Sequence, residues 1–466
     1  MTLIGIGLMT VAALAVWIRA RWRLTALLLI SVIALFALQT ERSTLAVALP
    51  VATVLLVIGV WWLVTPHRSP DDWRVMSLIA AITTAAALVR AVLLTDPSAI
   101  LEAARVLPPL MAVGAVAVSV GALVPSTDEA ARRRLALAFV ILIIGLFIIL
   151  KTPALHALVT GALIPAQAET ASLWGWLGFS YIAFRLMHVL LDYRIGRLAP
   201  VKLRDFALYV IFFPALTAGP IARIEHFARE LDTARRLDSA RLLDGGVRIG
   251  IGLFKKFVIA DTLALIALDP QLAAMTEAGP EVWWVMLYAY AFRIFFDFSG
   301  YVDIAIGIGR LAGIGLPENF AAPYLRRNIT AFWNSWHITL ATWFRTYFFT
   351  PLSRALMATP LRTRRLLVIF IAQVSTMILI GLWHGVAANF VLWGGWHGIG
   401  LWLHKWQSDR FRGWDAYVAD RPALGRIIHA GSVIVTFHFV ALGWVFFALD
   451  DPQLIARALA GLFGMG

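Results

Sequence analysis

The sequence predicts an all-α protein that crosses a membrane several times, because of its composition, its apolar runs and the placement of its charges. Of its 466 residues, 61% are hydrophobic and 14% are charged, and the mean hydropathy is +0.81. Soluble domains carry roughly a quarter charged residues and about half apolar ones. Lipid is therefore expected to surround most of this chain. It contains no cysteine, which excludes disulfides and thiolate chemistry.

The expected spans are apolar runs that approach the length of about 20 residues needed to cross a bilayer as a helix. No positive residue precedes the first run, which favours an uncleaved first span with an outer N-terminus. No internal repeat is evident. In chain order the runs are Leu3–Ile18, Leu24–Leu38, Leu45–Val64, Val75–Leu94, Leu107–Val124, Leu135–Leu150, Leu173–Leu191, Val247–Ile266, Val282–Phe298, Leu366–Trp383, Phe390–Leu403 and Ile427–Leu449.

Basic residues alternate between the loops as this topology requires. With the N-terminus outside, Arg132, Arg133 and Arg134 fall in an inner loop, whereas the outer stretch Asp269–Glu281 has acids and no Lys or Arg. Positive residues concentrate in cytoplasmic loops. The net charge of +13 is thus explained by topology and by anionic membrane lipids, and no nucleic-acid partner is expected.

Two further apolar stretches do not fit the count as ordinary spans. Phe206–Ala218 and Phe332–Thr350 each have basic residues on both sides, so both flanks are expected in the cytoplasm. Each contains helix punctuation, at Pro214 and Gly219-Pro220 in the first and at Thr350-Pro351, which is expected to end the second. Irregular backbone at membrane depth is tolerated only inside protein or beside a water-filled cavity. Both stretches are therefore predicted to be re-entrant or half-buried.

Histidines inside apolar segments are the main candidates for chemistry, because ionisable groups in a membrane are costly. His337, His384 and His397 each follow a Trp, and the last two precede a Gly that allows close approach of backbone or ligand. Apolar walls favour the neutral imidazole, the form that accepts a proton from a hydroxyl. His188 and His438 are expected to form hydrogen bonds in helix packing. No His-x-x-x-His or His-Glu-x-x-His spacing is present, so no metal site is predicted.

Carboxylates and one arginine add to these candidates. Asp297 and Asp303 lie at the end of an expected span, where they could orient a histidine or line a pore. Arg345 could bind an anionic donor such as coenzyme A, or a lipid headgroup. No phosphate-binding glycine loop, nucleophile elbow or dinucleotide fingerprint is present.

At these residues the sequence resembles the membrane-bound O-acyltransferase (MBOAT) superfamily, in its branch of bacterial polysaccharide O-acetyltransferases typified by the alginate enzyme. The matching stretches occur in order over Leu135–Leu449. They are Leu208–Arg223, Gly252–Asp261, Gly300–Ala305, Pro317–Phe320, Trp333–His337 and Gly381–Gly385. The resemblance implies a catalytic core over residues 131–466, preceded by additional or divergent transmembrane helices in residues 1–130.

The resemblance also implies roles for individual residues. His384, in Trp-His-Gly, corresponds to the catalytic histidine, and motif order favours it over His397. The second polar position corresponds to His337, the expected partner, or to Asn334. The implied fold is a ring of tilted helices around a thinned centre. Donor or substrate binding is expected at Asn334, Trp336, Arg345, Trp383, Asp303 and Asn389.

The function implied is transfer of an acetyl group across the bacterial inner membrane to an extracytoplasmic polysaccharide. The expected donor is cytoplasmic acetyl-CoA, with no bound cofactor and with His384 as base or transient acyl acceptor. A periplasmic acetyl-transferring protein is the expected partner. The alternatives are D-alanyl transfer towards teichoic acid from a carrier protein, and a polysaccharide transporter or flippase without acyl chemistry. Inverted repeats would favour a transporter, and none is evident.

Overall fold

The computed structural model describes residues 2–18, 22–39, 45–93, 128–163, 175–233, 237–411 and 421–465, and in these residues it contains helices and no strands. The predicted all-α fold class is confirmed. The chain divides into two compact units, one of residues 1–249 with 304–317 and one of residues 250–303 with 318–466. Helices α11 (Ser239–Leu253) and α14 (Pro280–Leu311) each begin in one unit and end in the other.

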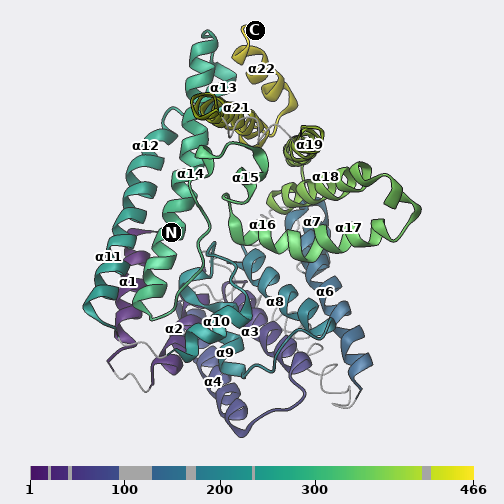
Figure 1. The fold of residues 1–466 in the computed structure, drawn as a ribbon. Helices are drawn as coiled ribbons and strands as arrows, with labels where there is room; N and C mark the ends of the chain where they lie inside the picture. The colour runs from purple at the N-terminus through teal and green to yellow at the C-terminus, as the bar shows by residue number, and fades with distance from the viewer. Residues whose placement is uncertain are drawn as a thin grey trace. The chain divides into compact units, whose positions relative to one another are not determined.

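The first unit is a helical bundle (Figure 1). Trp17 ties the returning segment to it by donating from its indole Nε1 to the carbonyl oxygen of Leu311 at 2.7 Å. Besides parts of α11 and α14, the described helices of this unit are α1 (Leu3–Ala15), α2 (Arg23–Ala37), α3 (Leu45–Val64), α4 (Pro70–Leu93), α6 (Glu129–Lys151), α7 (Pro153–Leu163), α8 (Phe179–Arg194), α9 (Leu203–Ile211) and α10 (Ile224–Asp232).

Burial separates the inner helices of the first unit from its outer ones. In α3, 78% of the apolar window is buried, and α8 buries residues on all of its faces. In α4 only 11% of the window is buried, and Leu88 and Val89 are exposed. A helix that is hydrophobic all round and buried is a core helix, whereas an exposed apolar face needs an apolar solvent. Helix α4 is therefore placed to contact lipid.

The predicted half-buried stretch Phe206–Ala218 is a short helix followed by a tight turn, and it is buried up to Leu216. Helix α9 has nine residues, or about 14 Å, which is too short to cross a hydrocarbon core of about 30 Å. Its broken end is satisfied by Arg185 of α8, which donates to the carbonyl oxygens of Val210 at 2.8 Å and Ala215 at 2.7 Å. A buried guanidinium thus replaces the hydrogen bonds that the helix loses there.

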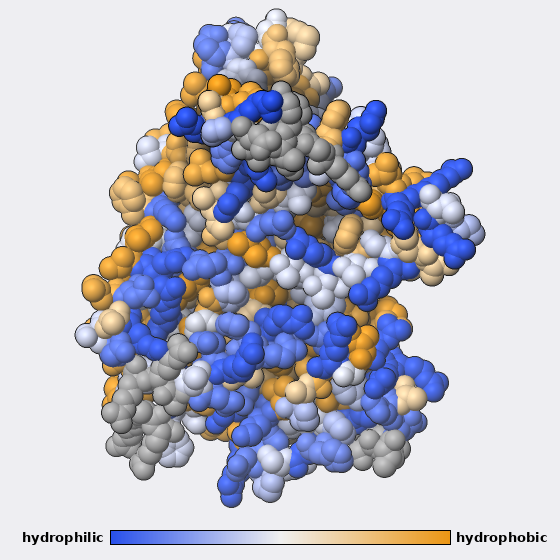
Figure 2. Space-filling view, viewed as in Figure 1, coloured by the Kyte–Doolittle hydropathy of each residue, from blue (hydrophilic) through white to orange (hydrophobic). Residues whose placement is uncertain are grey.

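The second unit holds the C-terminal part of the chain (Figure 1). Its described helices are the first part of α14 with α12 (Asp261–Ala264), α13 (Pro270–Met275), α15 (Ile329–Trp333), α16 (Ile338–Phe344), α17 (Thr350–Met357), α18 (Arg365–His384), α19 (Ala388–Arg410), α21 (Pro422–Ala448) and α22 (Pro452–Leu462). The turn between α17 and α18 carries exposed Arg362, Arg364 and Arg365, and hydrophilic residues colour that region blue in Figure 2.

Glycines bring α18 and α19 into close contact. A Cβ at Gly381 would lie 2.1 Å from the carbonyl oxygen of Phe390, and one at Gly394 would lie 2.5 Å from that of Met377. Small residues at a helix interface allow backbones to approach, as is common in membrane proteins. This packing fixes the end of α18, where His384 lies.

The second predicted half-buried stretch, Phe332–Thr350, breaks at residues 334–337 between α15 and α16. The expectation that Thr350-Pro351 ends the segment is wrong, because helix continues through α17 to Met357. A π-helical turn at Arg345–Phe349 precedes the proline. Such a turn rearranges the backbone hydrogen bonds next to a residue that lacks an N–H, so the chain absorbs the proline without stopping.

Five described helices are long and apolar enough to cross a membrane. They contain the predicted runs Leu45–Val64, Leu135–Leu150 and Leu366–Trp383 and, within a residue at one end, Val75–Leu94 and Ile427–Leu449. The chain is thus a multi-pass membrane protein. Leu107–Val124 lies outside the described residues, as does the beginning of Leu173–Leu191. The division at residue 130 stays a prediction.

Candidate active site

His384 is the last residue of α18, and it is half-buried among aromatic rings of the second unit. Its imidazole centroid lies 4.5 Å from that of Trp383 and 4.8 Å from that of Phe447 on α21. Trp393 and Phe390 of α19 lie at 5.6 Å and 6.2 Å. The predicted aromatic wall is present, and it leaves part of the imidazole accessible.

His337 is buried in the break between α15 and α16, with 3% of its surface exposed. Its φ of 43° lies in the left-handed region, which is uncommon for a residue other than glycine. Neither of its ring nitrogens has a hydrogen-bond partner among the described residues. A strained backbone and an unsatisfied buried imidazole are both costly, and such features cluster at functional sites.

Trp383 connects the two histidines. Its ring centroid lies 4.5 Å from that of His384 and 6.2 Å from that of His337, and Phe298 of α14 closes on His337 at 4.7 Å. Two imidazoles predicted to work together, from segments 47 positions apart in the sequence, thus contact one indole. The structure gives Trp383 a position between candidate catalytic groups.

The backbone at His337 is held by Asn319, a fully buried residue in the loop before α15. Its carbonyl oxygen accepts from Ile338 N at 3.0 Å, and its side-chain Oδ1 accepts from the hydroxyl of Thr339 at 2.7 Å. Sequence reasoning quoted Asn319 within a motif and assigned it no role. Its position in the Pro317–Phe320 motif was the available signal in the sequence.

Asn334 and Arg345 meet at a cavity of about 230 Å³ in the second unit. The Arg345 guanidinium donates to Asn334 Oδ1, and Trp333, Gln373 and Ile380 also line the space. A cavity with apolar walls and a few polar groups is the usual form of a small-molecule site. The structure therefore brings together two of the residues predicted to bind the donor.

The remaining predicted binding residues make contacts that hold neighbouring segments together. Asp303 Oδ2 accepts from Lys255 Nζ at 2.7 Å, which ties α14 to the π-helical turn at Phe254–Ala260. Asn389 donates from Nδ2 to the carbonyl oxygen of Phe446 at 3.1 Å. Trp336 is buried and its ring lies 5.2 Å from that of Trp444. Whether these three residues touch substrate stays a prediction.

His397, the rival of His384, is fully buried within α19. Its ring lies 5.1 Å from Trp393 and 5.3 Å from Trp333, and its nitrogens have no hydrogen-bond partner in the described part of the chain. His384 is the more accessible of the two, which suits a group that must meet substrate. The expected packing bonds of His438 are present, to the Tyr288 hydroxyl and the Ile434 carbonyl oxygen, both at 2.8 Å.

Comparison with known proteins adds a second, independent observation. The sequence model of the MBOAT, membrane-bound O-acyltransferase family matches residues 194–419. A protein of Pseudomonas aeruginosa described as "probable alginate O-acetylase" is 35% identical over 291 residues, which cover 62% of this chain and 52% of that protein. The chain thus spans about half the length of this relative.

Two relatives with other substrates in their names match comparably. A peptidoglycan O-acetyltransferase of Helicobacter pylori is 33% identical over 266 residues, covering 56% of this chain and 47% of that protein. A teichoic acid D-alanyltransferase of Streptococcus thermophilus is 32% identical over 296 residues, covering 61% of this chain and 71% of that protein.

Proposed function

Since the chain belongs to the membrane-bound O-acyltransferase family, we propose that it transfers an acetyl group from a thioester donor to a polysaccharide hydroxyl, with His384 as general base. The observation that carries this proposal is the pairing of His384 and His337 on the Trp383 indole. Aromatic walls disfavour a charged imidazole, and a neutral one can accept a proton.

The reaction balances without a further reagent. His384 takes the proton from the acceptor hydroxyl while the hydroxyl oxygen bonds to the thioester carbonyl carbon. The carbon–sulfur bond breaks, and the proton passes to the departing sulfur. General-base assistance of this kind is worth about 10²–10⁴-fold in rate. The buried His337 would donate a hydrogen bond from its ring N–H to the carbonyl oxygen as negative charge develops there.

Acetyl-CoA in the cytoplasm is the proposed donor. Arg345 offers a planar cation for a phosphate group, and Asn334 lies beside it at the cavity. The exposed arginines between α17 and α18 fit a cytoplasmic face under the positive-inside rule. We propose that the protein lies in the bacterial inner membrane, where the acetyl group passes either directly to the glycan hydroxyl or through a separate periplasmic protein.

D-alanyl transfer is the second candidate, and the similarity to the Streptococcus thermophilus enzyme favours it. Both reactions use a thioester on a phosphopantetheine arm and differ in the group transferred. The similarity to two O-acetyl-transferring relatives supports the acetyl reading.

Glycan analysis of host cells tests the proposal. His384→Ala should abolish O-acetylation of one surface polymer, while His429→Ala, a matched change at an exposed position, should leave it intact. If every O-acetyl group persists in cells that contain the His384→Ala protein at wild-type levels, the proposal fails. Loss of D-alanyl ester in place of acetyl ester would establish the second candidate.

A further inference from the structure

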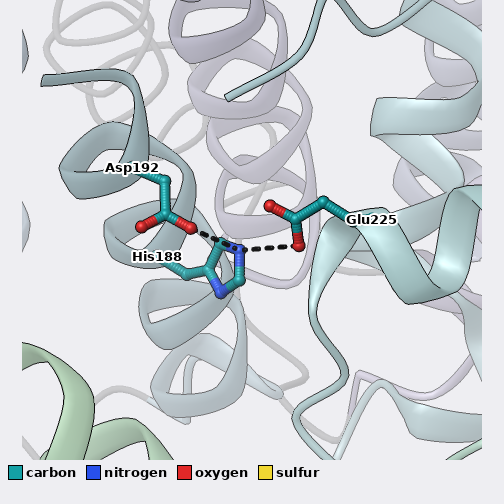
Figure 3. Close-up of side chains that lie close together, drawn as sticks. All are labelled: His188, Asp192 and Glu225. Carbon is teal, nitrogen blue, oxygen red and sulfur yellow. Dashed lines mark ion pairs between the residues drawn. The ribbon is translucent and has the colours of Figure 1, made fainter. Parts of the chain in front are cut away.

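Three side chains able to coordinate a cation gather in the first unit, and none of them belongs to the candidate active site. His188 and Asp192 lie one turn apart on α8, and Glu225 comes from the first turn of α10. Figure 3 shows the imidazole and the two carboxylates pointing toward one another. His188 is 2% exposed and Asp192 is 0% exposed, while Glu225 is partly open.

One distance between these side chains matches the separation of zinc ligands, and the others are longer. His188 Nε2 lies 3.4 Å from Asp192 Oδ2 and 3.9 Å from Glu225 Oε2, and all three ligand atoms lie within 4.8 Å of one another. An N–H···O hydrogen bond is typically about 2.9–3.0 Å long. Two ligands held tetrahedrally at about 2.0–2.1 Å from a zinc ion stand about 3.3 Å apart. An inward shift of Glu225 would complete the triangle.

Arg223 pairs with both carboxylates of this group. Arg223 donates from its Nη2 to Asp192 Oδ2 at 2.9 Å and from its Nε to Glu225 Oε2 at 3.3 Å. Each carboxylate oxygen can accept a second interaction, so Arg223 fixes the orientation of the carboxylates as outer hydrogen-bond partners of metal ligands commonly do.

We propose that His188, Asp192 and Glu225 bind a divalent transition-metal ion of the zinc type. One imidazole and two carboxylates suit such an ion, and three protein ligands leave a fourth position for water. The ion joins α10 to α8. Helix α10 already buries Ile224, Phe227 and Leu231, so the metal fixes an amphipathic helix that packing has brought into place. This role is independent of the acyl-transfer reaction.

The experiment uses the full-length, tag-free protein in nanodiscs, stripped with EDTA and titrated with Zn²⁺. Wild-type protein should bind one equivalent saturably, and its unfolding temperature should rise with Zn²⁺ and fall with EDTA, as mass action requires for a ligand of the native state. Co²⁺ in place of Zn²⁺ should give the visible absorption of a low-symmetry, four-coordinate site.

Variants decide whether these residues hold the ion. Glu225→Gln keeps the size of a partly exposed side chain and should weaken Zn²⁺ binding by about tenfold or more, a loss expected even for outer-sphere partners. Asp192→Asn should do the same if it folds. His226→Gln, next to the site and exposed, is the matched control and should bind as wild type. Absence of saturable binding to wild-type protein, or equal binding by Glu225→Gln, overturns the proposal.

Discussion

A methyl group added at Gly381 should disable the candidate site without touching a catalytic atom. An ideal Cβ at this position would lie 2.1 Å from the carbonyl oxygen of Phe390. Real Cβ contacts are essentially never shorter than 3.0 Å, and the obstacle is backbone that cannot rotate away. Helices α18 and α19 must therefore separate locally by at least about 0.9 Å, the difference between the two distances.

That displacement acts directly on His384. Gly381 lies three residues before it on α18, and the Phe390 ring lies 6.2 Å from the His384 ring. A misplacement of about 1 Å can cost on the order of 100-fold in rate, because the reacting groups leave their attack geometry. Overpacking of this kind also costs about 1–3 kcal/mol of stability. We expect Gly381→Ala to show both losses.

Gly395→Ala is the matched control, since it lies on α19 and a Cβ there would meet nothing within 4 Å. Replacing a helical glycine by alanine at an open position should stabilise by up to about 1 kcal/mol. Both variants are assayed in vesicles for acetyl transfer from labelled acetyl-CoA, and by thermal unfolding followed through tryptophan fluorescence. If Gly381→Ala is as active and as stable as Gly395→Ala, the reasoning about helix packing at the site is refuted.

Three further substitutions test other parts of the account. At His337 φ is 43°, so the His337→Gly protein should be more stable than the His337→Val protein in thermal unfolding by about 1–2 kcal/mol, because only valine is strained there. Both variants should be inactive. Equal stability of the two variants would contradict the strain. Arg185→Met should cost about 2–6 kcal/mol in denaturant titrations, because the buried carbonyl groups of Val210 and Ala215 lose their donor, and a cost below 1 kcal/mol would contradict this. Arg345→Lys should raise the KM for acetyl-CoA more than it lowers kcat, since a point charge replaces a planar fork; an unchanged KM would remove Arg345 from the donor site.

The fold class was predictable because long apolar runs such as Leu45–Val64 indicate membrane helices. Interruptions were harder to predict. Pro214 and Pro351 look alike as helix breakers, yet α9 ends before the first and a π-helical turn carries the helix past the second. Local sequence does not show which backbone groups will find other partners, and tertiary packing decides it.

The candidate site was predictable only where its contacts are local in the sequence. The Trp-His-Gly sequence places Trp383 against His384, and the structure adds Trp383 to His337. Phe447, which closes on His384 from another helix, had no signal in the sequence, because nothing in a single chain reveals contacts between distant segments. The gathering of Glu225 with His188 was missed for that reason too, since His188 was expected only to form a packing hydrogen bond.

The most direct test of the central claim is turnover of a defined donor by purified protein. Protein in vesicles is incubated with [¹⁴C]acetyl-CoA and an acceptor glycan, and both free CoA and labelled glycan are measured. We predict that wild-type protein and His429→Ala release CoA and label the acceptor, whereas His384→Ala, folded to the same extent, does neither above background. Labelling by His384→Ala at the wild-type rate would contradict the account, as would movement of glycan across the vesicle membrane without any release of CoA by the wild-type protein.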